Sequence, residues 1–353
     1  MSVGHAPPTG TGEADRLLGP LVAAAGGASA VAVAAHRGGR RLLAAAGTTA
    51  HGGGPAADPR TPFEIGSVTK TFTALLLADM AARGEVGYDD PVDRHLPPGT
   101  APRARGGPVT LLHLATHTSG LRRLPPGLLR SAAPRWYSNP YERFDTADLL
   151  TSLPRARPFA RPGERMRYSN FGVALLGLAL ARAAGSDYAE LLTGRVLAPL
   201  GLTGTGCTDG PDRATGYWRG RARPGWRIPG LAAAGALRSS ARDLLRYLEA
   251  HLAPGTAAQG NGALRTALTE VTRPRLVAPP GRDRICLVWN ARPRPGHDLY
   301  FHSGGTRGCT TFVGFSPQRD VAFAALANTS PTLRGAFVQR AYLTLRALAA
   351  APD

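Results

Sequence analysis

The stretch "EIGSVTKTFTALL", residues 64–76, contains Lys70, the only lysine in a chain of 353 residues that has 42 lysines and arginines. Apolar residues continue at helical spacing, which predicts a buried helix over residues 69–82. Ser67 and Lys70 are three residues apart, so their side chains share one face of the first turn. Arginine stays charged, whereas a desolvated lysine can lose its proton and act as a base. The single lysine therefore predicts chemistry at Ser67, although a capping serine and a solvated lysine are the simpler alternative.

Strand-like and helical patterns surround this stretch in a definite order. A first helix is expected over residues 14–26, then a hairpin over "SAVAVAAHRGGRRLLAAAG", residues 29–47, with its turn at residues 36–39. Helical patterns separated by proline-rich loops fill residues 85–215, and another helix follows a serine cap at Ser239 or Ser240. Four strand-like runs and a helix over 331–350 close the chain; the runs are "RICLVWN" (284–290), "DLYFHSGG" (298–305), "CTTFVGFS" (309–316) and "VAFAALAN" (321–328).

This order predicts an α+β fold in which an antiparallel sheet is flanked by helices and an all-helical region is inserted. Residues 1–84 and 216–353 would form the body that carries the sheet, and residues 85–215 would form the mainly helical region. We expect the active site in the cleft between the two.

Composition excludes several classes of protein. The net charge of +18 would suit nucleic acid, but the arginines are spread along the chain and aromatic residues make up only 7%. Three cysteines, an odd number without a CxxC pair, argue against a disulfide framework. The N-terminus lacks a basic leader and no apolar run is long enough to span a membrane, so we expect a cytoplasmic protein without nucleic-acid or membrane partners.

A serine and a lysine need partners for catalysis, and two further motifs supply candidates. Tyr-x-Asn occurs at residues 137–139, inside what is predicted to be a surface turn, and at 168–170, directly before an apolar helix that would hold it rigidly. We favour the second. The segment "FHSGGTRG", residues 301–308, ends a predicted strand with small residues, where a substrate backbone could approach closely.

Together these motifs resemble the serine β-lactamase and penicillin-binding-protein superfamily, and most closely its class C β-lactamase-like branch, with SxxK, YxN and HxG elements. The resemblance covers roughly residues 18–345. Seven segments carry it in order: "FEIGSVTKTFTALL", "GYDDPVDRHLP", "LLHLATHTSGL", "RPGERMRYSNFGVALLG", "LAPLGLTGTG", "AAAGALRSSARDLLRYL" and "HSGGTRG".

The resemblance implies a role for each matching residue. Ser67 would be the acylated nucleophile, and Lys70 and Tyr168 would share its proton, with the identity of the general base left open. Asn170 would hold the acyl side of the substrate and steady Lys70. The backbone N–H groups of Ser67 and Gly305 would form the oxyanion hole.

His302 departs from the family's K-T-G form, in which a lysine meets a substrate carboxylate. A histidine is mostly neutral near pH 7, which favours esters, amides or thioesters. Ser303 and Gly304 would line the substrate's path, and Arg307 would restore an anion site unless it is only a solvated loop arginine.

Residues near this predicted cleft could reshape it. Cys309 stands where relatives often carry an aromatic residue. The segment 122–145 could cover the cleft, with Trp136 and Tyr137 as lining candidates, or these residues could only anchor a loop.

Two further patterns resemble known kinds of site, a zinc site and a pair of catalytic carboxylates. His113 and His117 have the spacing of a zinc-protease helix, but the glutamate of HExxH is missing, so we expect no metal and no cofactor. Asp89 and Asp90 lie on a predicted turn, where capping or a salt bridge explains them better than acid–base chemistry.

The leading hypothesis is a serine hydrolase acting on an ester or amide through a Ser67 acyl-enzyme. A biosynthetic acyltransferase or stand-alone thioesterase is the second hypothesis, with a small-molecule or peptide acyl substrate that could be bound to a carrier protein. A D,D-peptidase is third, and a binding protein that kept the fold without activity is the alternative outside enzymes. The sequence leaves the oligomeric state open.

Overall fold

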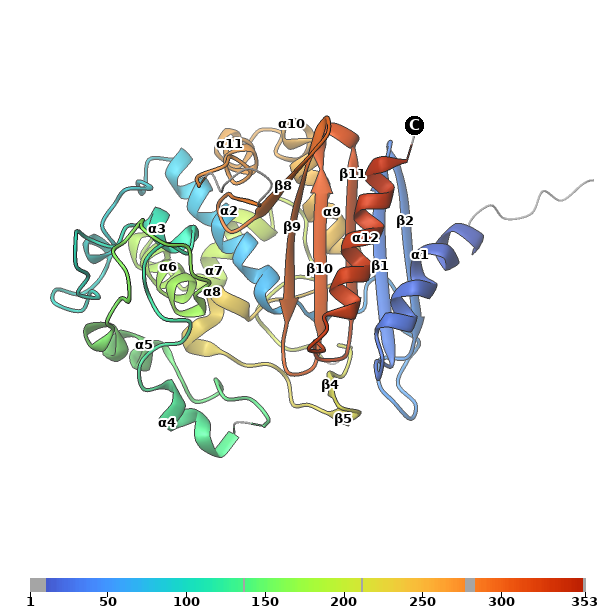
Figure 1. Ribbon diagram of the computed structural model, residues 1–353, viewed down its shortest axis with the longest axis horizontal. Coiled ribbons are helices and arrows are strands. Elements are labelled where there is room, and N and C mark those ends of the chain that lie inside the picture. The colour runs from blue at the N-terminus through green and yellow to red at the C-terminus, as the bar shows by residue number, and fades with distance from the viewer. Residues whose placement is uncertain (1–10, 136, 211, 277–282, 352–353) are drawn as a thin grey trace, which may run out of the picture.

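The computed structural model describes residues 11–135, 137–210, 212–276 and 283–351, and Figure 1 shows their arrangement. A seven-stranded sheet has the order β2-β1-β11-β10-β9-β8-β7, and every neighbouring pair is antiparallel. Its strands are β1 (Ala30–Arg37), β2 (Arg40–Gly47), β7 (Arg284–Ile285), β8 (Asn290–Arg294), β9 (His297–Gly305), β10 (Thr310–Ser316) and β11 (Val321–Ala327). The antiparallel sheet predicted from the sequence is confirmed.

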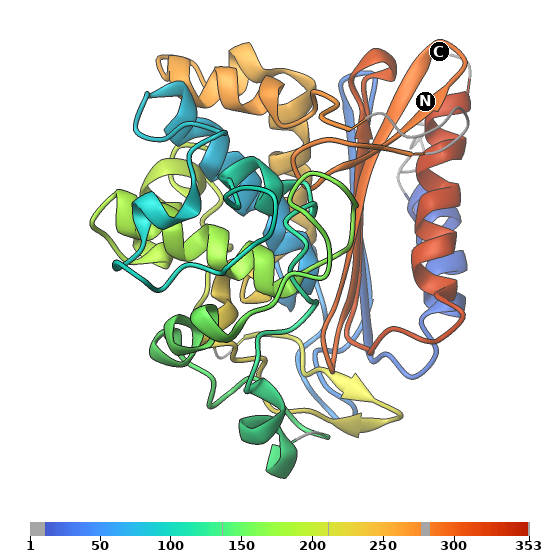
Figure 2. The ribbon, with the colours of Figure 1, turned by 60° about the vertical axis from the view of Figure 1, so that its left-hand side comes forward.

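Helices cover both faces of the sheet, as Figure 2 shows with the sheet seen nearly edge-on. Helices α1 (Thr11–Ala24) and α12 (Ala336–Ala350) pack on one face, and α9 (Ala241–Leu252) packs on the other. Strand β1 shows why: Val31, Val33 and Ala35 face the first layer, while its intervening alanines face the second. Central strands β10 and β11 are buried throughout because both of their faces are covered.

A thick helical layer lies beyond α9. Its elements are α2 (Thr69–Ala82), α3 (Leu111–Ala115), α4 (Leu128–Ala132), α5 (Thr146–Ser152), α6 (Asn170–Ala183), α7 (Tyr188–Leu192), α8 (Ala232–Gly235), α10 (Pro254–Ala257) and α11 (Gly262–Glu270). Two short ribbons, β3 (Phe63–Glu64) with β6 (Arg238–Ser239) and β4 (Tyr217–Trp218) with β5 (Arg221–Ala222), complete the secondary structure that concerns the site. Because α8, α10 and α11 also belong to the helical layer, both halves of the sequence build it, and the division at residues 84 and 216 stays a prediction.

Several local expectations are corrected or sharpened. The hairpin turn is Gly38–Gly39, both with positive φ, while the strand continues through Arg37. Residues 284–290 are not one strand, because the chain turns at Val288 (φ 66°) with 286–289 buried, and β8 begins only at residue 290. The last helix begins at Ala336, after a loop.

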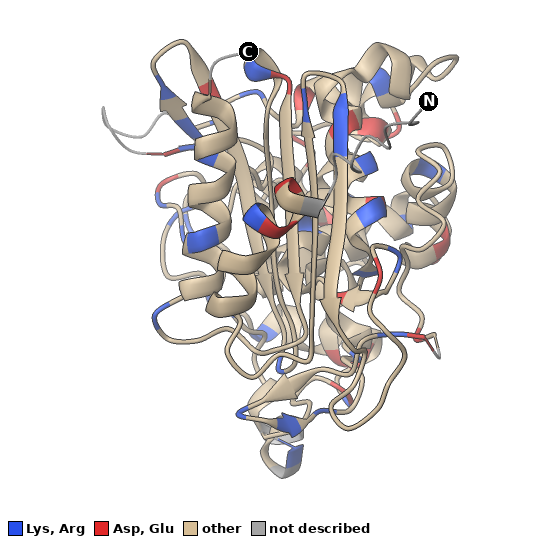
Figure 3. Cartoon of the chain, turned by 90° about the vertical axis from the view of Figure 1, so that its right-hand side faces the viewer, with Lys and Arg blue, Asp and Glu red and all other residues tan. Residues whose placement is uncertain are grey.

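The caps and surface charges agree with the sequence. Ser240, not Ser239, caps α9 by accepting a hydrogen bond from the backbone N–H of Asp243 at 3.2 Å. Arginines are scattered over the face shown in Figure 3 rather than gathered in one stripe. Within the described ranges, no helix combines the length and apolar character needed to cross a membrane.

Candidate active site

Ser67 lies in a 3₁₀ turn, Gly66–Val68, directly before the buried helix α2. The turn is pressed against the end of β9: a Cβ at Gly66, which has φ +48°, would lie 2.6 Å from the carbonyl oxygen of Gly305. A Cβ at Gly304 would lie only 2.0 Å from the carbonyl oxygen of Ile65. Glycines at both positions therefore let the strand backbone approach the serine.

Lys70 is fully buried, which excludes the solvated interpretation of its charge. Its Nζ donates to Ser67 Oγ at 3.0 Å and to the carbonyl oxygen of Ala234 at 2.5 Å. Burial lowers the pKa of Lys70, the charge of Arg123 lowers it further, and the contact with Tyr168 opposes the shift. The lysine is thus placed to give up its proton beside the serine.

Tyr168 completes the cluster from the helical layer. Its hydroxyl donates to Ser67 Oγ at 2.6 Å, and Lys70 Nζ lies 5.0 Å from the centre of its ring. The next residue, Ser169, caps α6 by accepting from the backbone N–H of Gly172 at 2.8 Å and donates to the carbonyl of Arg122 at 2.7 Å. The helix start fixes the tyrosine in place, as the sequence predicted for this copy of Tyr-x-Asn.

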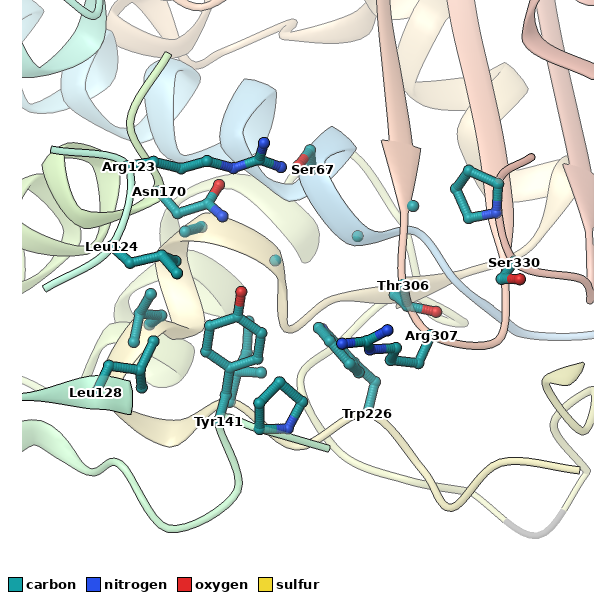
Figure 4. Close-up of a pocket in the computed structure, with 18 of the residues that line it drawn as sticks. Ser67, Arg123, Leu124, Leu128, Tyr141, Asn170, Trp226, Thr306, Arg307 and Ser330 are labelled. Atoms are coloured by element: carbon teal, nitrogen blue, oxygen red, sulfur yellow. The ribbon is translucent and has the colours of Figure 1, made fainter. Parts of the chain in front are cut away.

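Asn170 is brought to the site but does not make the predicted contact with Lys70. It is the first residue of α6 and lines a pocket beside Ser67, as Figure 4 shows. Its Oδ1 is buried without a hydrogen-bond partner among the described residues. The carbonyl of Ala234 receives the lysine's hydrogen bond instead, because α8 brings that backbone group close to α2.

The K-T-G position is occupied by an uncharged imidazole. Burial lowers the pKa of His302 to about 3, and the charge of Lys70 acts in the same direction. The ring's Nδ1 has no hydrogen-bond partner within the part of the chain that the structure describes. Neutral His302 fits the expectation drawn from the sequence.

Two pockets meet at Ser67, and they differ in chemistry. One, here called the aromatic pocket, has a volume of about 350 Å³. Its distinctive side chains are Leu124, Leu128, Tyr141, Asn170, Trp218, Trp226, Ile228 and Arg307. The other, here called the imidazole pocket, has a volume of about 470 Å³. Its distinctive residues are His117, Met166, Tyr168, Asn290, His302, Ser303 and Gly304. Ser67, Arg123, Gly305, Thr306 and Pro331 lie in both.

The cover of the cleft differs in part from the expectation. Tyr137 is 70% exposed, stacks on Trp218 at 6.2 Å between ring centres and lines neither of the two pockets, whereas Tyr141 lines the aromatic pocket. Trp136 lies outside the described residues. Cys309 is fully buried and lines neither pocket.

A buried carboxylate beside the nucleophile was missed. Glu64 of β3 accepts from Thr306 Oγ1 at 2.6 Å and from the backbone N–H of Trp226 at 2.8 Å. Burial raises its pKa, against the effect of these hydrogen bonds. The carboxylate of Glu64 thus links the turn after β9 to the strand before Ser67 by a hydrogen bond. Its position three residues before the serine was the available signal.

The histidine pair His113 and His117, and Asp90, have structural roles. His113 helps to cap α3 with Thr110, and His117 packs its ring against Tyr168 at 4.7 Å. Within the described ranges, no cluster of three histidine, cysteine or acidic residues could hold a metal. Asp90 accepts from the backbone N–H of Gly87 at 2.8 Å and pairs with Arg94 at 3.0 Å, which confirms the salt-bridge interpretation.

The fold and the cluster of Ser67, Lys70 and Tyr168 define the class of this protein: an enzyme of the serine-hydrolase type. A family model described as Beta-lactamase matches residues 14–348, and the chain therefore belongs to the beta-lactamase family.

Curated relatives agree with this family. "D-alanyl-D-alanine-carboxypeptidase/endopeptidase AmpH" of Escherichia coli (strain K12) is 30% identical over 285 residues, which cover 76% of this chain and 71% of that protein. A "Beta-lactamase" of the same organism is 33% identical over 199 residues, 55% of this chain and 49% of its own. A "Beta-lactamase" of Lysobacter lactamgenus is 27% identical over 316 residues, 78% and 76% of the two chains.

Proposed function

We propose that this chain is a serine hydrolase that cleaves an ester or an amide through an acyl-enzyme on Ser67. The observation that carries the proposal is the position of Ser67 Oγ, which receives hydrogen bonds from Tyr168 at 2.6 Å and from fully buried Lys70 at 3.0 Å. A binding protein has no need of a buried lysine with a lowered pKa at this place.

Acylation begins when Ser67 Oγ attacks the substrate's carbonyl carbon and gives its proton to the pair formed by Lys70 and Tyr168. The two groups share this proton, so their titration belongs to the pair rather than to either residue. The backbone N–H groups of Ser67 and Gly305 stabilise the oxyanion, at about 3 kcal/mol of barrier for each donor. The pair then protonates the leaving group, and water completes the cycle by the same steps in reverse order.

The need to protonate the leaving group suggests which pocket holds the leaving group and which holds the acyl group. Tyr168 lines the imidazole pocket and not the aromatic pocket. A leaving group must lie within reach of the group that protonates it. The leaving group therefore occupies the imidazole pocket, and the acyl group extends into the aromatic pocket beside Asn170.

His302 bears on the choice between two substrate classes: an ester or amide, and a peptide that ends in a carboxylate. On the leaving-group side this residue adds no charge, because burial lowers its pKa to about 3. A neutral ring at the K-T-G position supports substrates whose leaving group is uncharged. A D,D-peptidase is the second candidate, favoured by the similarity to the carboxypeptidase/endopeptidase of E. coli.

Three substrates distinguish these activities: a p-nitrophenyl alkanoate, a chromogenic cephalosporin and a peptide ending in D-Ala-D-Ala. We expect the ester to give the highest kcat/KM and the Ser67→Ala variant to lose turnover of all three. Faster release of D-alanine than of nitrophenol would establish the peptidase instead. Turnover that survives in Ser67→Ala would contradict the acyl-enzyme.

A further inference from the structure

We propose that the aromatic pocket selects an acyl chain with an apolar body that ends in a carboxylate, so that the preferred donor is the half-ester or half-amide of a dicarboxylic acid. This inference rests on the proposed function, because it takes the aromatic pocket as the acyl side. In this proposal the substrate's carboxylate is bound on the acyl side of Ser67. In family members with the K-T-G motif, by contrast, the carboxylate is bound by the lysine whose position His302 occupies here.

The walls of the aromatic pocket fit a chain of this kind. Seven leucine, isoleucine, tyrosine and tryptophan side chains belong to its lining: Leu124, Leu128, Tyr141, Trp218, Trp226, Ile228 and Leu231. The volume of about 350 Å³ is at the lower end of the range for small-molecule sites, so the chain must be short. Burial of methylene groups against these rings would contribute about 0.8 kcal/mol each.

Two guanidinium groups lie on the same walls. Arg307, half-buried on the turn after β9, lines only this pocket of the two, and Arg123 lies beside Ser67, where the two pockets meet (Figure 4). The described lining includes no aspartate or glutamate. The nearby carboxylate, Glu64, is buried and already accepts hydrogen bonds from Thr306 and Trp226. The described lining therefore combines arginine side chains with apolar ones.

Three guanidinium groups lie close to the ring of Trp218. The guanidinium carbon of Arg307 lies 5.7 Å from the ring centre of Trp218, and those of Arg219 and Arg223 lie 5.3 and 5.1 Å from the same ring. A guanidinium group near an aromatic ring is attracted to the ring's electrons, and a guanidinium group can bind a carboxylate through two of its N–H groups. The three arginines concentrate positive charge around Trp218, which lines the pocket.

The test compares two esters that differ only in charge: 4-nitrophenyl hydrogen glutarate and its methyl ester, each corrected for spontaneous hydrolysis. We expect the wild type to prefer the anion in kcat/KM by about ten-fold or more at low salt. Sodium chloride should reduce this ratio, because Arg123 is exposed and its charge is screened. Succinate and adipate half-esters are shorter and longer by one methylene. Their rates show the chain length at which the substrate's carboxylate reaches the arginines of the pocket.

Variants test whether the preference for the anionic ester arises from the aromatic pocket. Arg307→Gln should bring the ratio of anion to neutral ester toward one, and Arg307→Lys should keep part of it. Arg319→Gln is the matched control, since Arg319 is exposed at the other end of β10, and it should keep the full ratio.

A wild-type ratio at or below one, or a ratio unchanged in Arg307→Gln, would overturn the inference. Labelling of Ser67 by a fluorophosphonate separates this failure from failure of the proposed function. Labelling without a preference for the anion rejects only the acyl specificity. Absence of both labelling and ester turnover rejects the proposed function, and the inference with it.

Discussion

Thr306→Val should break the link between the nucleophile and the strand that would provide the oxyanion hole. The hydroxyl of Thr306 donates to the carboxylate of Glu64 at 2.6 Å and accepts the backbone N–H groups of Gly308 and Cys309 at 3.0 and 2.9 Å. Valine has nearly the same shape, so the change removes these hydrogen bonds and leaves the packing in place. Thr306→Ser keeps the hydroxyl and is the matched control.

The hydrogen bonds set the size of the effect. Loss of a donor to a buried carboxylate costs about 1.5–3 kcal/mol, and two backbone N–H groups without an acceptor cost about 1 kcal/mol each or more. We expect the free energy of unfolding to fall by about 3–5 kcal/mol in urea titrations. Displacement of the turn that holds Gly305 should also reduce kcat/KM for a nitrophenyl ester by about 10- to 100-fold.

The deficit of Thr306→Val should depend on pH in a fixed direction. Burial raises the pKa of Glu64 above its usual 4.5, so ionising this carboxyl costs stability as the pH rises through its folded pKa. Removing a donor to the ionised form raises that pKa further. The stability deficit should therefore grow from pH 4.5 toward pH 8. A deficit below about 1 kcal/mol at pH 8, or one equal to that of Thr306→Ser, would refute this reasoning.

Three further changes test other parts of the site. Lys70→Arg should slow acylation by about 10³-fold, because arginine cannot take up the proton that Lys70 and Tyr168 share. In stopped-flow measurements the variant should also lose the rising limb of the pH–rate profile, which in wild type reflects titration of the pair, with the pKa of Lys70 lowered from its usual 10.5 by burial. Gly304→Ala would place a methyl 2.0 Å from the carbonyl of Ile65 and should abolish activity with a loss of melting temperature, whereas Gly262→Ala, with open space around it, should change neither. His302→Lys should raise acylation by penicillins relative to esters, measured as a ratio of rates, and a lower ratio would contradict the role given to the neutral imidazole.

Local patterns in the sequence were enough to predict the elements that carry the chemistry. Helix α2 and the β1–β2 hairpin follow from apolar spacing and from paired glycines. The three catalytic candidates could be chosen because an SxxK pair and a tyrosine before a helix are sequence-local features.

Contacts made by the backbone and by tertiary packing could not be predicted in this way. The carbonyl that receives the hydrogen bond of Lys70 belongs to Ala234, and a carbonyl has no residue-type signature. Glu64 became important only because folding buries it against Thr306. Tyr137 and Tyr141 are both aromatic residues of one loop, and only the path of that loop decides that the second lines the pocket.

The most direct test of the central claim is the intact mass of the protein after brief reaction with a nitrophenyl ester and acid quenching. The wild type should gain the mass of one acyl group, and peptide mapping should place it on Ser67. Ser67→Ala should gain none, and Lys70→Arg should gain it far more slowly. An acyl group on another residue, or equal labelling of wild type and Lys70→Arg, would contradict the account.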